Sequence, residues 1–372
     1  MLGVYVHLPF CPYLCPYCDF AKWPARESAA QRYLAALYAE IEREPPASAA
    51  TMYLGGGTPN SYDQERITDL LTRLRRRFSG AKEISIEVNP ELVREGDLAK
   101  YCDVGITRLS IGVQSFEPSE IQILGRKHNV VQIENVVAAA RAAQLSSVSV
   151  DLIFAVPGQT PASWRRSLRA AIALDVDHVS AYGLTVEEGT PYAAWRAREP
   201  QAFHDDVSEA ELYAIAIETL QDAGYEQYEI SNFARPGHQC AHNLNYWANG
   251  EYAGLGVGAA SYRGGVRSVH TRSLEEYINS ALSGCAIPMQ AERLSGRKRA
   301  GEAMMLALRT AQGVRLSDFK KQYGVDVIAE YAPVVTQFSR TGLLERTGDT
   351  MRLTRQGRFF ANDVCGAFLT FE

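Results

Sequence analysis

The chain has 372 residues, of which 46% are apolar, and a formal net charge of −5 at pH 7. This size predicts one large domain with a smaller one, and the acidic balance argues against a nucleic-acid partner. No run of about 18 apolar residues predicts a membrane span. The first residues, MLGVYVHLPF, lack the basic region of a secretory signal. We therefore expect a cytoplasmic protein.

Short apolar runs alternate with helical patterns over the first 180 residues. Strands are expected at 2–8, 51–54, 83–88, 108–113, 148–154 and 178–182, and helices at 28–44, 62–77, 95–102, 130–144 and 161–174. Such alternation is typical of parallel strands joined by right-handed crossovers. The units are too few for an eight-stranded barrel, so the predicted fold is α/β, with a partial, open (β/α)6 TIM-like barrel.

The pattern changes twice in the second half of the chain. The repeats end after residue 230, and 236–292 is expected to be a connecting segment, rich in glycine at 249–265. Residues 293–372 show helical patterns and a hairpin around Gly348 and Asp349. We therefore expect a core domain at 1–235, the connection, and a C-terminal α+β domain of winged-helix type at 293–372. This last domain has no basic stripe, so DNA binding is not expected.

Three cysteines lie close together directly after the first expected strand. Cys11, Cys15 and Cys18 form a C-x3-C-x2-C pattern. In a reducing compartment, clustered cysteines indicate a metal or catalytic site rather than a disulfide. A closed zinc site usually has four ligands. Thiolates are the usual ligands of iron–sulfur clusters, and three of them leave one iron of a [4Fe–4S] cluster open. The alternative is a zinc site.

The cysteine pattern, with the aromatic Tyr17 before its last member, resembles the radical S-adenosylmethionine (SAM) superfamily. The resemblance implies that Cys11, Cys15 and Cys18 hold a [4Fe–4S] cluster. It also implies that SAM binds the open iron through its amino and carboxylate groups. The position after the first strand agrees with this role, because barrels build their sites at the carboxyl ends of their strands.

Further polar or glycine residues stand at the ends of the next strands. A GGGTP turn follows the second strand, Glu87 lies near the end of the third, Gln114 follows the fourth, and Asp151 lies on the fifth. These motifs resemble oxygen-independent coproporphyrinogen III oxidase and its relatives. The resemblance implies SAM contacts at Tyr5, Tyr17, Gly56, Gly57, Thr58, Glu87, Gln114, Arg126 and Asp151. In the oxidase, the positions of Gly57, Thr58, Gln114, Arg126 and Asp151 line a second SAM site.

Two departures separate the chain from the true oxidases. These carry another cysteine two residues after the third, where this chain has Phe20, and a long extension before the first strand. The sequence HNLNYW at 242–247 instead resembles the H-N-x-x-Y-W motif of haem chaperones of the HemW type. Histidine and tyrosine both serve as haem ligands, so the resemblance makes His242 and Tyr246 candidates. The alternative is that His242 and Trp247 pack the domain junction.

The expected function is therefore that of a HemW-type haem chaperone. Such a protein would bind a [4Fe–4S] cluster, SAM and haem, and would pass haem to acceptor haemoproteins such as respiratory proteins. Whether SAM is cleaved stays open, and peripheral membrane association and a homodimer are further expectations. The competing hypothesis is an enzyme, either oxygen-independent coproporphyrinogen III dehydrogenase or another radical SAM porphyrin-modifying enzyme.

Overall fold

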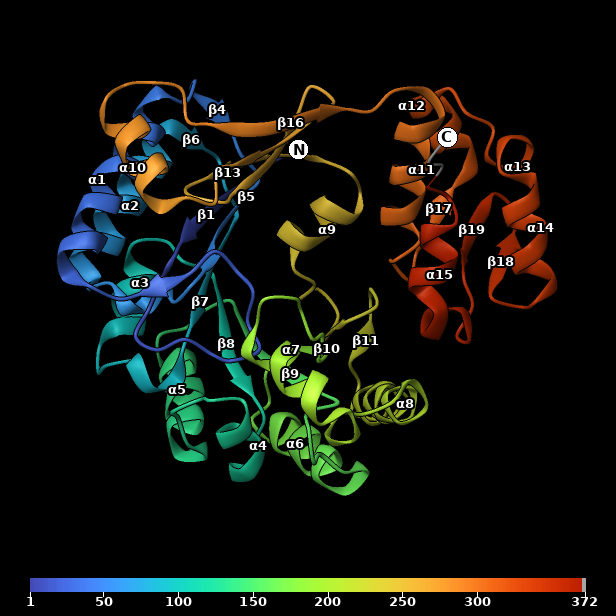
Figure 1. Ribbon diagram of the computed structural model, residues 1–372, viewed down its shortest axis with the longest axis horizontal. Helices are drawn as coiled ribbons and strands as arrows, with labels where there is room; N and C mark the ends of the chain where they lie inside the picture. Colours follow the sequence, from blue (N-terminus) through green and yellow to red (C-terminus); the bar gives the residue numbers. More distant parts are fainter. Residues whose placement is uncertain (370–372) are drawn as a thin grey trace.

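The computed structural model describes residues 1–369 and contains a partial barrel with a smaller domain beside it (Figure 1). The barrel strands are β1 (Leu2–Leu8), β5 (Thr51–Gly56), β7 (Glu83–Val88), β8 (Arg108–Gln114), β9 (Ser147–Phe154) and β10 (His178–Gly183). Each pairs in parallel with the next in this series. The prediction of an α/β fold with a partial barrel is therefore confirmed.

Helices between the strands cover the outer face of the sheet (Figure 1). They are α1 (Glu27–Arg43), α2 (Gln64–Arg77), α3 (Asp97–Asp103), α5 (Val130–Ala142), α6 (Pro161–Ala173) and α8 (Asp206–Asp222). Short helices α4 (Pro118–Ile123) and α7 (Pro191–Arg198) lie in the loops after β8 and β10. The sequence supplies its own caps: the side chains of Asn129 and Thr160 begin α5 and α6 with capping boxes.

The two faces of the barrel strands meet different surroundings. On β7, Ile84 and Ile86 are buried in the main hydrophobic core, and Leu109 does the same on β8. Their neighbours Glu87 and Ser110 line a cavity inside the barrel. Because successive side chains of a strand point to opposite faces, the apolar face packs under the helices and the polar face is left to form a site.

The sheet continues on the far side of β1, through the segment that the sequence predicted as a connection. Here β13 (Glu251–Leu255) pairs in parallel with β1, and it is followed by β14 (Ala260–Arg263), β15 (Val266–His270) and β16 (Met289–Arg293) in antiparallel order. A Cβ atom at Gly254 would collide with the backbone of Ala260. This close approach explains part of the glycine-rich pattern.

Smaller elements complete both edges of the sheet. On the β10 side, β12 (Asn232–Ala234) and β11 (Glu226–Gln227) add antiparallel pairs. On the β1 side, α10 (Leu274–Leu282) packs against α1. Helix α9 (Ala241–Trp247), which carries the HNLNYW motif, packs against β5 and β13. The motif thus packs against the barrel.

The C-terminal domain has its own core, which includes Met304, Phe319, Tyr331 and Phe338. It contains α11 (Gly296–Ala307), α12 (Leu316–Tyr323), α13 (Val327–Glu330), α14 (Ala332–Arg340) and α15 (Ala361–Gly366), with strands β17 (Val314–Arg315), β18 (Leu344–Thr347) and β19 (Thr350–Leu353). The expected hairpin turns at Gly348, where φ is +60°. The expected smaller α+β domain is confirmed, although positions 370–372 lie outside the described residues.

The two domains meet around α9 and α11. Arg267 on β15 forms an ion pair with Glu302 on α11. The guanidinium of Arg309 lies 5.2 Å from the ring centre of Trp247 at the end of α9. The packing role considered for Trp247 is therefore present in the structure. No helix within residues 1–369 is long and apolar enough to cross a bilayer.

Candidate functional site

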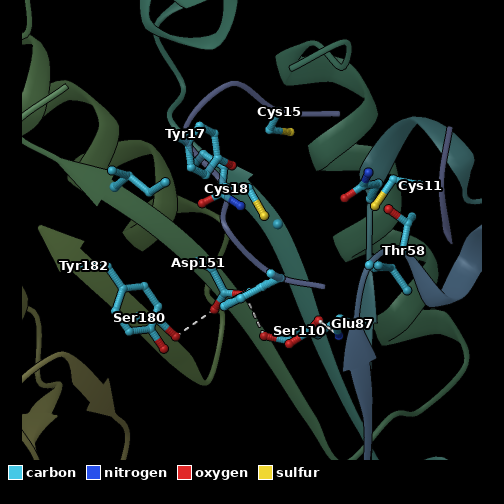
Figure 2. Close-up of a pocket in the computed structure, with 18 of the residues that line it drawn as sticks. Cys11, Cys15, Tyr17, Cys18, Thr58, Glu87, Ser110, Asp151, Ser180 and Tyr182 are labelled. Carbon is cyan, nitrogen blue, oxygen red and sulfur yellow. Dashed lines mark hydrogen bonds between the residues drawn. The ribbon is translucent and has the colours of Figure 1, made fainter. Parts of the chain in front are cut away.

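A cavity of about 460 Å³ opens at the carboxyl ends of the barrel strands (Figure 2). It gathers most of the residues that the sequence singled out: Cys11, Cys15, Tyr17, Cys18, Gly56, Gly57, Thr58, Glu87, Gln114, Arg126 and Asp151. Tyr5, His242 and Tyr246 line an adjoining cavity instead. Both cavities share walls, including Tyr53, Gly56 and Glu87. We call the first the cluster cavity and the second the junction cavity.

Cys11 ends the short strand β2 (Phe10–Cys11), and Cys15 and Cys18 lie in the loop that leads to β3 (Trp23–Pro24); we call residues 11–22 the cysteine loop. All three are free thiols, and Figure 2 shows their sulfur atoms around one space in the cluster cavity. Burial raises the pKa of the Cys11 and Cys18 thiols. Lys22 opposes this effect from within the loop, where its ammonium group donates to the carbonyl of Cys18. A bound metal would displace the remaining thiol protons.

This donor set fits an iron–sulfur cluster. In the described part of the chain, no three His, Cys, Asp or Glu side chains lie close enough to share one metal ion. A [4Fe–4S] cluster makes a different demand, because each of its thiolate ligands binds a different iron. Cys11, Cys15 and Cys18, whose thiols lie around one space, would be its ligands.

The glycine turn consists of Gly56, which ends β5, and Gly57, which follows it. A side chain at either position would collide with neighbouring atoms. Gly56 has a φ of +107°, and a Cβ atom there would collide with the ring of His7. A Cβ atom at Gly57 would lie 2.7 Å from the carbonyl oxygen of Leu8. Since these neighbours belong to β1 and the chain leading to the cysteines, the glycines fix the distance between the turn and the cysteine loop.

Two of the carboxylates that line the cluster cavity, those of Glu87 and Asp151, accept hydrogen bonds from side chains that the sequence analysis did not identify. Glu87 accepts hydrogen bonds from Tyr53 Oη (2.9 Å) and Gly56 N (3.1 Å), and burial raises its pKa to about 7. Asp151 accepts from Ser110 Oγ (2.9 Å) and Ser180 Oγ (2.6 Å), and burial raises its pKa as well. The signal available for both serines was a small polar residue inside a largely apolar strand.

Arg126 brings a buried cation to the same cavity. Its Nη2 atom donates to Asn89 Oδ1 and to Gly112 O, both at 2.7 Å. Its Nη1 atom lies 3.8 Å from Cys15 Sγ. Within residues 1–369 its buried Nε atom has no hydrogen-bond partner. Because Arg126 lines the cavity, its positive charge fits a carboxylate-bearing ligand such as SAM.

Two more of the expected residues reach the cluster cavity through local geometry. Gln114 ends β8 with a φ of +65°, beside an irregularity in the pairing of β8 with β9, and this turns it toward the cavity. Tyr17 packs its ring against Tyr192, with the ring centres 6.2 Å apart. Tyr5 is separate: its hydroxyl lies 2.9 Å from His7 Nδ1, on the junction-cavity side.

His242 is buried, with 1% of its surface exposed, and both of its ring nitrogens have partners. Nδ1 lies 2.8 Å from Thr51 Oγ1, and Nε2 lies 2.8 Å from Tyr246 Oη. The ring stacks on Tyr53 at 5.2 Å, and burial lowers its pKa to about 4. The predicted haem ligand is therefore engaged in the fold, and binding iron would require one of these hydrogen bonds to break.

Comparisons with known proteins agree with this architecture. Residues 5–171 match the family model of the radical SAM superfamily, and residues 294–360 match the HemN C-terminal domain. Similar curated proteins include heme chaperone HemW of Bacillus subtilis, 33% identical over 99% of both chains. Heme chaperone HemW of Mycobacterium tuberculosis H37Rv is 36% identical over 99% of this chain and 94% of its own.

A solved structure extends the likeness to three dimensions. Coproporphyrinogen III oxidase (HemN) from Escherichia coli, described as a radical SAM enzyme, superposes with a TM-score of 0.87 at 25% identity. The match covers 100% of this chain and 90% of HemN. Heme chaperone HemW of Escherichia coli K12 is 30% identical over 99% of this chain and 98% of its own. The chain therefore belongs to the radical SAM superfamily and, within it, to the HemN-like family that includes the HemW proteins.

Proposed function

We propose that this protein is a haem chaperone of the HemW type. It binds a [4Fe–4S] cluster, SAM and haem, and it delivers haem to acceptor haemoproteins such as respiratory proteins. The observation that carries the proposal is the convergence of the cysteine loop, the glycine turn and the acidic strand ends on one cavity. The full-length similarity to curated heme chaperones supports the haem part.

In this proposal, Cys11, Cys15 and Cys18 are the ligands of the cluster. When bound, the cluster and SAM supply one-electron chemistry that no protein side chain offers. The chain's own contribution is to hold and orient. The rigid glycine turn at Gly56 and Gly57 presents backbone to the ligand, and the buried cavity limits access of water.

In the proposal, different polar groups of the cluster cavity contact different parts of SAM. Glu87 is positioned by Tyr53 and Gly56 to accept a hydrogen bond from an amino group or from ribose hydroxyls. Arg126 offers its positive charge to a carboxylate, and Asp151 is fixed by two serines. Thr58, Gln114, Tyr17 and Tyr5 complete the proposed set. A second SAM molecule, membrane association and a homodimer stay predictions from the family.

The alternative is a coproporphyrinogen III dehydrogenase, and the match to HemN favours it specifically. Phe20 weakens this alternative, because it stands where the oxidase pattern has a cysteine. Phe20 lines both cavities and is 61% exposed. An apolar ring at that place offers surface to a flat ligand but no thiol chemistry.

One anaerobic experiment distinguishes the two functions. The reconstituted protein is given SAM and a reductant, and then either coproporphyrinogen III or haem followed by an apo-haemoprotein. The proposal predicts stoichiometric haem binding, transfer of haem to the acceptor and no protoporphyrinogen IX. Formation of protoporphyrinogen IX with turnover would establish the enzyme instead, and absence of haem binding would contradict the chaperone.

A further inference from the structure

The junction cavity has a volume of about 690 Å³ and lies beside the barrel, with Leu306 of the C-terminal domain in its lining. Its walls come from β1, the cysteine loop, β5, β7, β10, α9, β13, β14, β15 and α11. Most of the large side chains are aromatic or aliphatic: Tyr5, Phe20, Tyr53, Tyr182, Tyr246, Tyr252, Val269 and Leu306. This volume lies within the usual range of small-molecule sites, which is about 300–1,000 Å³. A cavity walled by rings suits a large flat ligand.

Two arginines are the cations of this cavity, and they differ in their partners. Arg267 forms an ion pair with Glu302, so its charge is already balanced. Arg272 follows β15 and is exposed. Its Nη2 atom donates to the backbone carbonyl of Asp19 at 2.6 Å. Among residues 1–369, no carboxylate lies within ion-pair distance of Arg272, although the Asp19 side chain also lines the cavity.

The guanidinium of Arg272 therefore has donors to spare. It carries five N–H groups, and the hydrogen bond to Asp19 uses one of them. Arginine binds carboxylates with two parallel hydrogen bonds where its planar edge is free. The other acid lining the cavity, Glu87, accepts hydrogen bonds from Tyr53 and Gly56 and forms no ion pair with Arg272. Within residues 1–369, the Arg272 guanidinium therefore has no carboxylate as an ion-pair partner, and an incoming ligand could provide one.

We propose that the junction cavity holds the tetrapyrrole ring and that Arg272 binds one of its propionate carboxylates. This inference rests on the proposed function, since it assigns a place and an anchor to the haem. The aromatic walls cover the faces of the ring, and the charged edge of the ring lies at the exposed rim. Arg272 also holds Asp19, which directly follows Cys18, so the propionate anchor lies next to the cysteine loop.

The test compares haemin with haemin dimethyl ester, whose propionates carry no charge. Both are titrated, in the same dilute detergent, into the full-length protein with its cluster reconstituted. The variants are Arg272→Gln and a control, Arg293→Gln. Arg293 is an exposed arginine on β16 whose Nη1 atom donates to the carbonyl of Gly264 at 2.9 Å, and it does not line the cavity. Binding is followed by the Soret band and by tryptophan fluorescence.

We expect wild type and R293Q to bind haemin at least about tenfold more tightly than the diester. R272Q should lose that preference, while its affinity for the diester stays unchanged and shows that the cavity is intact. The assignment is overturned if R272Q keeps the preference for haemin, or if it loses both ligands equally. Failure of wild type to bind haemin at all would overturn the proposed function, and this inference with it.

Discussion

Tyr246 places its hydroxyl 2.8 Å from Nε2 of His242, four residues earlier on α9. Residues spaced by four lie on the same face of a helix, so the two conspicuous side chains of the HNLNYW motif bond to each other. Thr51 on β5 takes the other nitrogen. Through His242, the motif therefore connects α9 to the barrel.

Replacing His242 should cost stability in the protein without cofactors. His242→Ala removes a buried ring stacked on Tyr53 and leaves the hydroxyls of Thr51 and Tyr246 without their partner. We predict a loss of about 2–4 kcal/mol in the free energy of unfolding, measured by urea denaturation. His238→Ala is the control, since His238 is only partly buried, and it should cost less than about 1 kcal/mol. If His242→Ala and His238→Ala had equal free energies of unfolding, the claim that His242 holds α9 against the barrel would be refuted.

Tyr246→Phe tests whether His242 is a haem ligand. The change keeps the aromatic ring but removes the hydroxyl that occupies Nε2. If His242 binds the iron, this nitrogen no longer has to be released, and haem affinity should rise by about tenfold, the equivalent of one hydrogen bond. The measurement is a haem titration with a low-temperature EPR spectrum. Unchanged or weaker binding would argue against ligation by His242.

Glu87 predicts a particular dependence of stability on pH. Burial raises the pKa of Glu87 in the folded state to about 7. In the unfolded chain its pKa is the ordinary value for glutamic acid, about 4.3. The folded state therefore binds the proton more tightly, and this contribution to stability is lost as pH rises through about 7. Glu87→Gln cannot lose a proton and should escape that loss.

We therefore expect Glu87→Gln to gain roughly 1–3 kcal/mol relative to wild type between pH 5 and pH 8, with the range set by about 1.4 kcal/mol per pKa unit. The comparison is made by urea denaturation of the protein without cofactors, and Glu65→Gln, a change at an exposed position, serves as the control. A constant difference between E87Q and wild type across this range would show that Glu87 is ionised throughout.

Gly57→Ala should damage the turn that faces the cysteine loop. The added Cβ atom would lie 2.7 Å from backbone atoms of Leu8 and Pro9, which cannot give way as a flexible side chain could. We predict a loss of about 1–3 kcal/mol of stability together with weaker SAM binding by calorimetry. Gly366→Ala, where a Cβ atom meets nothing within 4 Å, is the matched control. A G57A variant as stable as G366A would contradict the close packing.

Local pattern was enough to predict the barrel and much of the cluster cavity. In one strand, the sequence places the apolar Ile84 and Ile86 on one face and Glu87 on the other. This pattern already separates a core face from a site face. The fixed spacing of the cysteines and the glycine turn marks the loops at the strand ends. These signals lie within a few residues of one another, so a single sequence contains them.

Pairings between distant segments were not predictable in the same way. β13 joins β1 through Leu2 and Glu251, and no local feature of a glycine-rich segment selects that neighbour. The surroundings of His242 depend on Thr51 and Tyr53, which come from a strand almost two hundred residues earlier. From the sequence, His242 was a candidate haem ligand, with packing at the domain junction as the alternative. In the fold, both of its nitrogens have partners.

The cysteine loop is the most direct test of the whole account. Wild type and the single variants Cys11→Ala, Cys15→Ala, Cys18→Ala and Cys285→Ala are reconstituted anaerobically, and iron, sulfide and the EPR spectrum with and without SAM are measured. Cys285 is exposed and distant from the cavity in sequence. We predict about four irons per chain, and an EPR signal that SAM alters, in wild type and C285A only. A full iron content in any of the three loop variants, or a wild-type spectrum indifferent to SAM, would contradict the account.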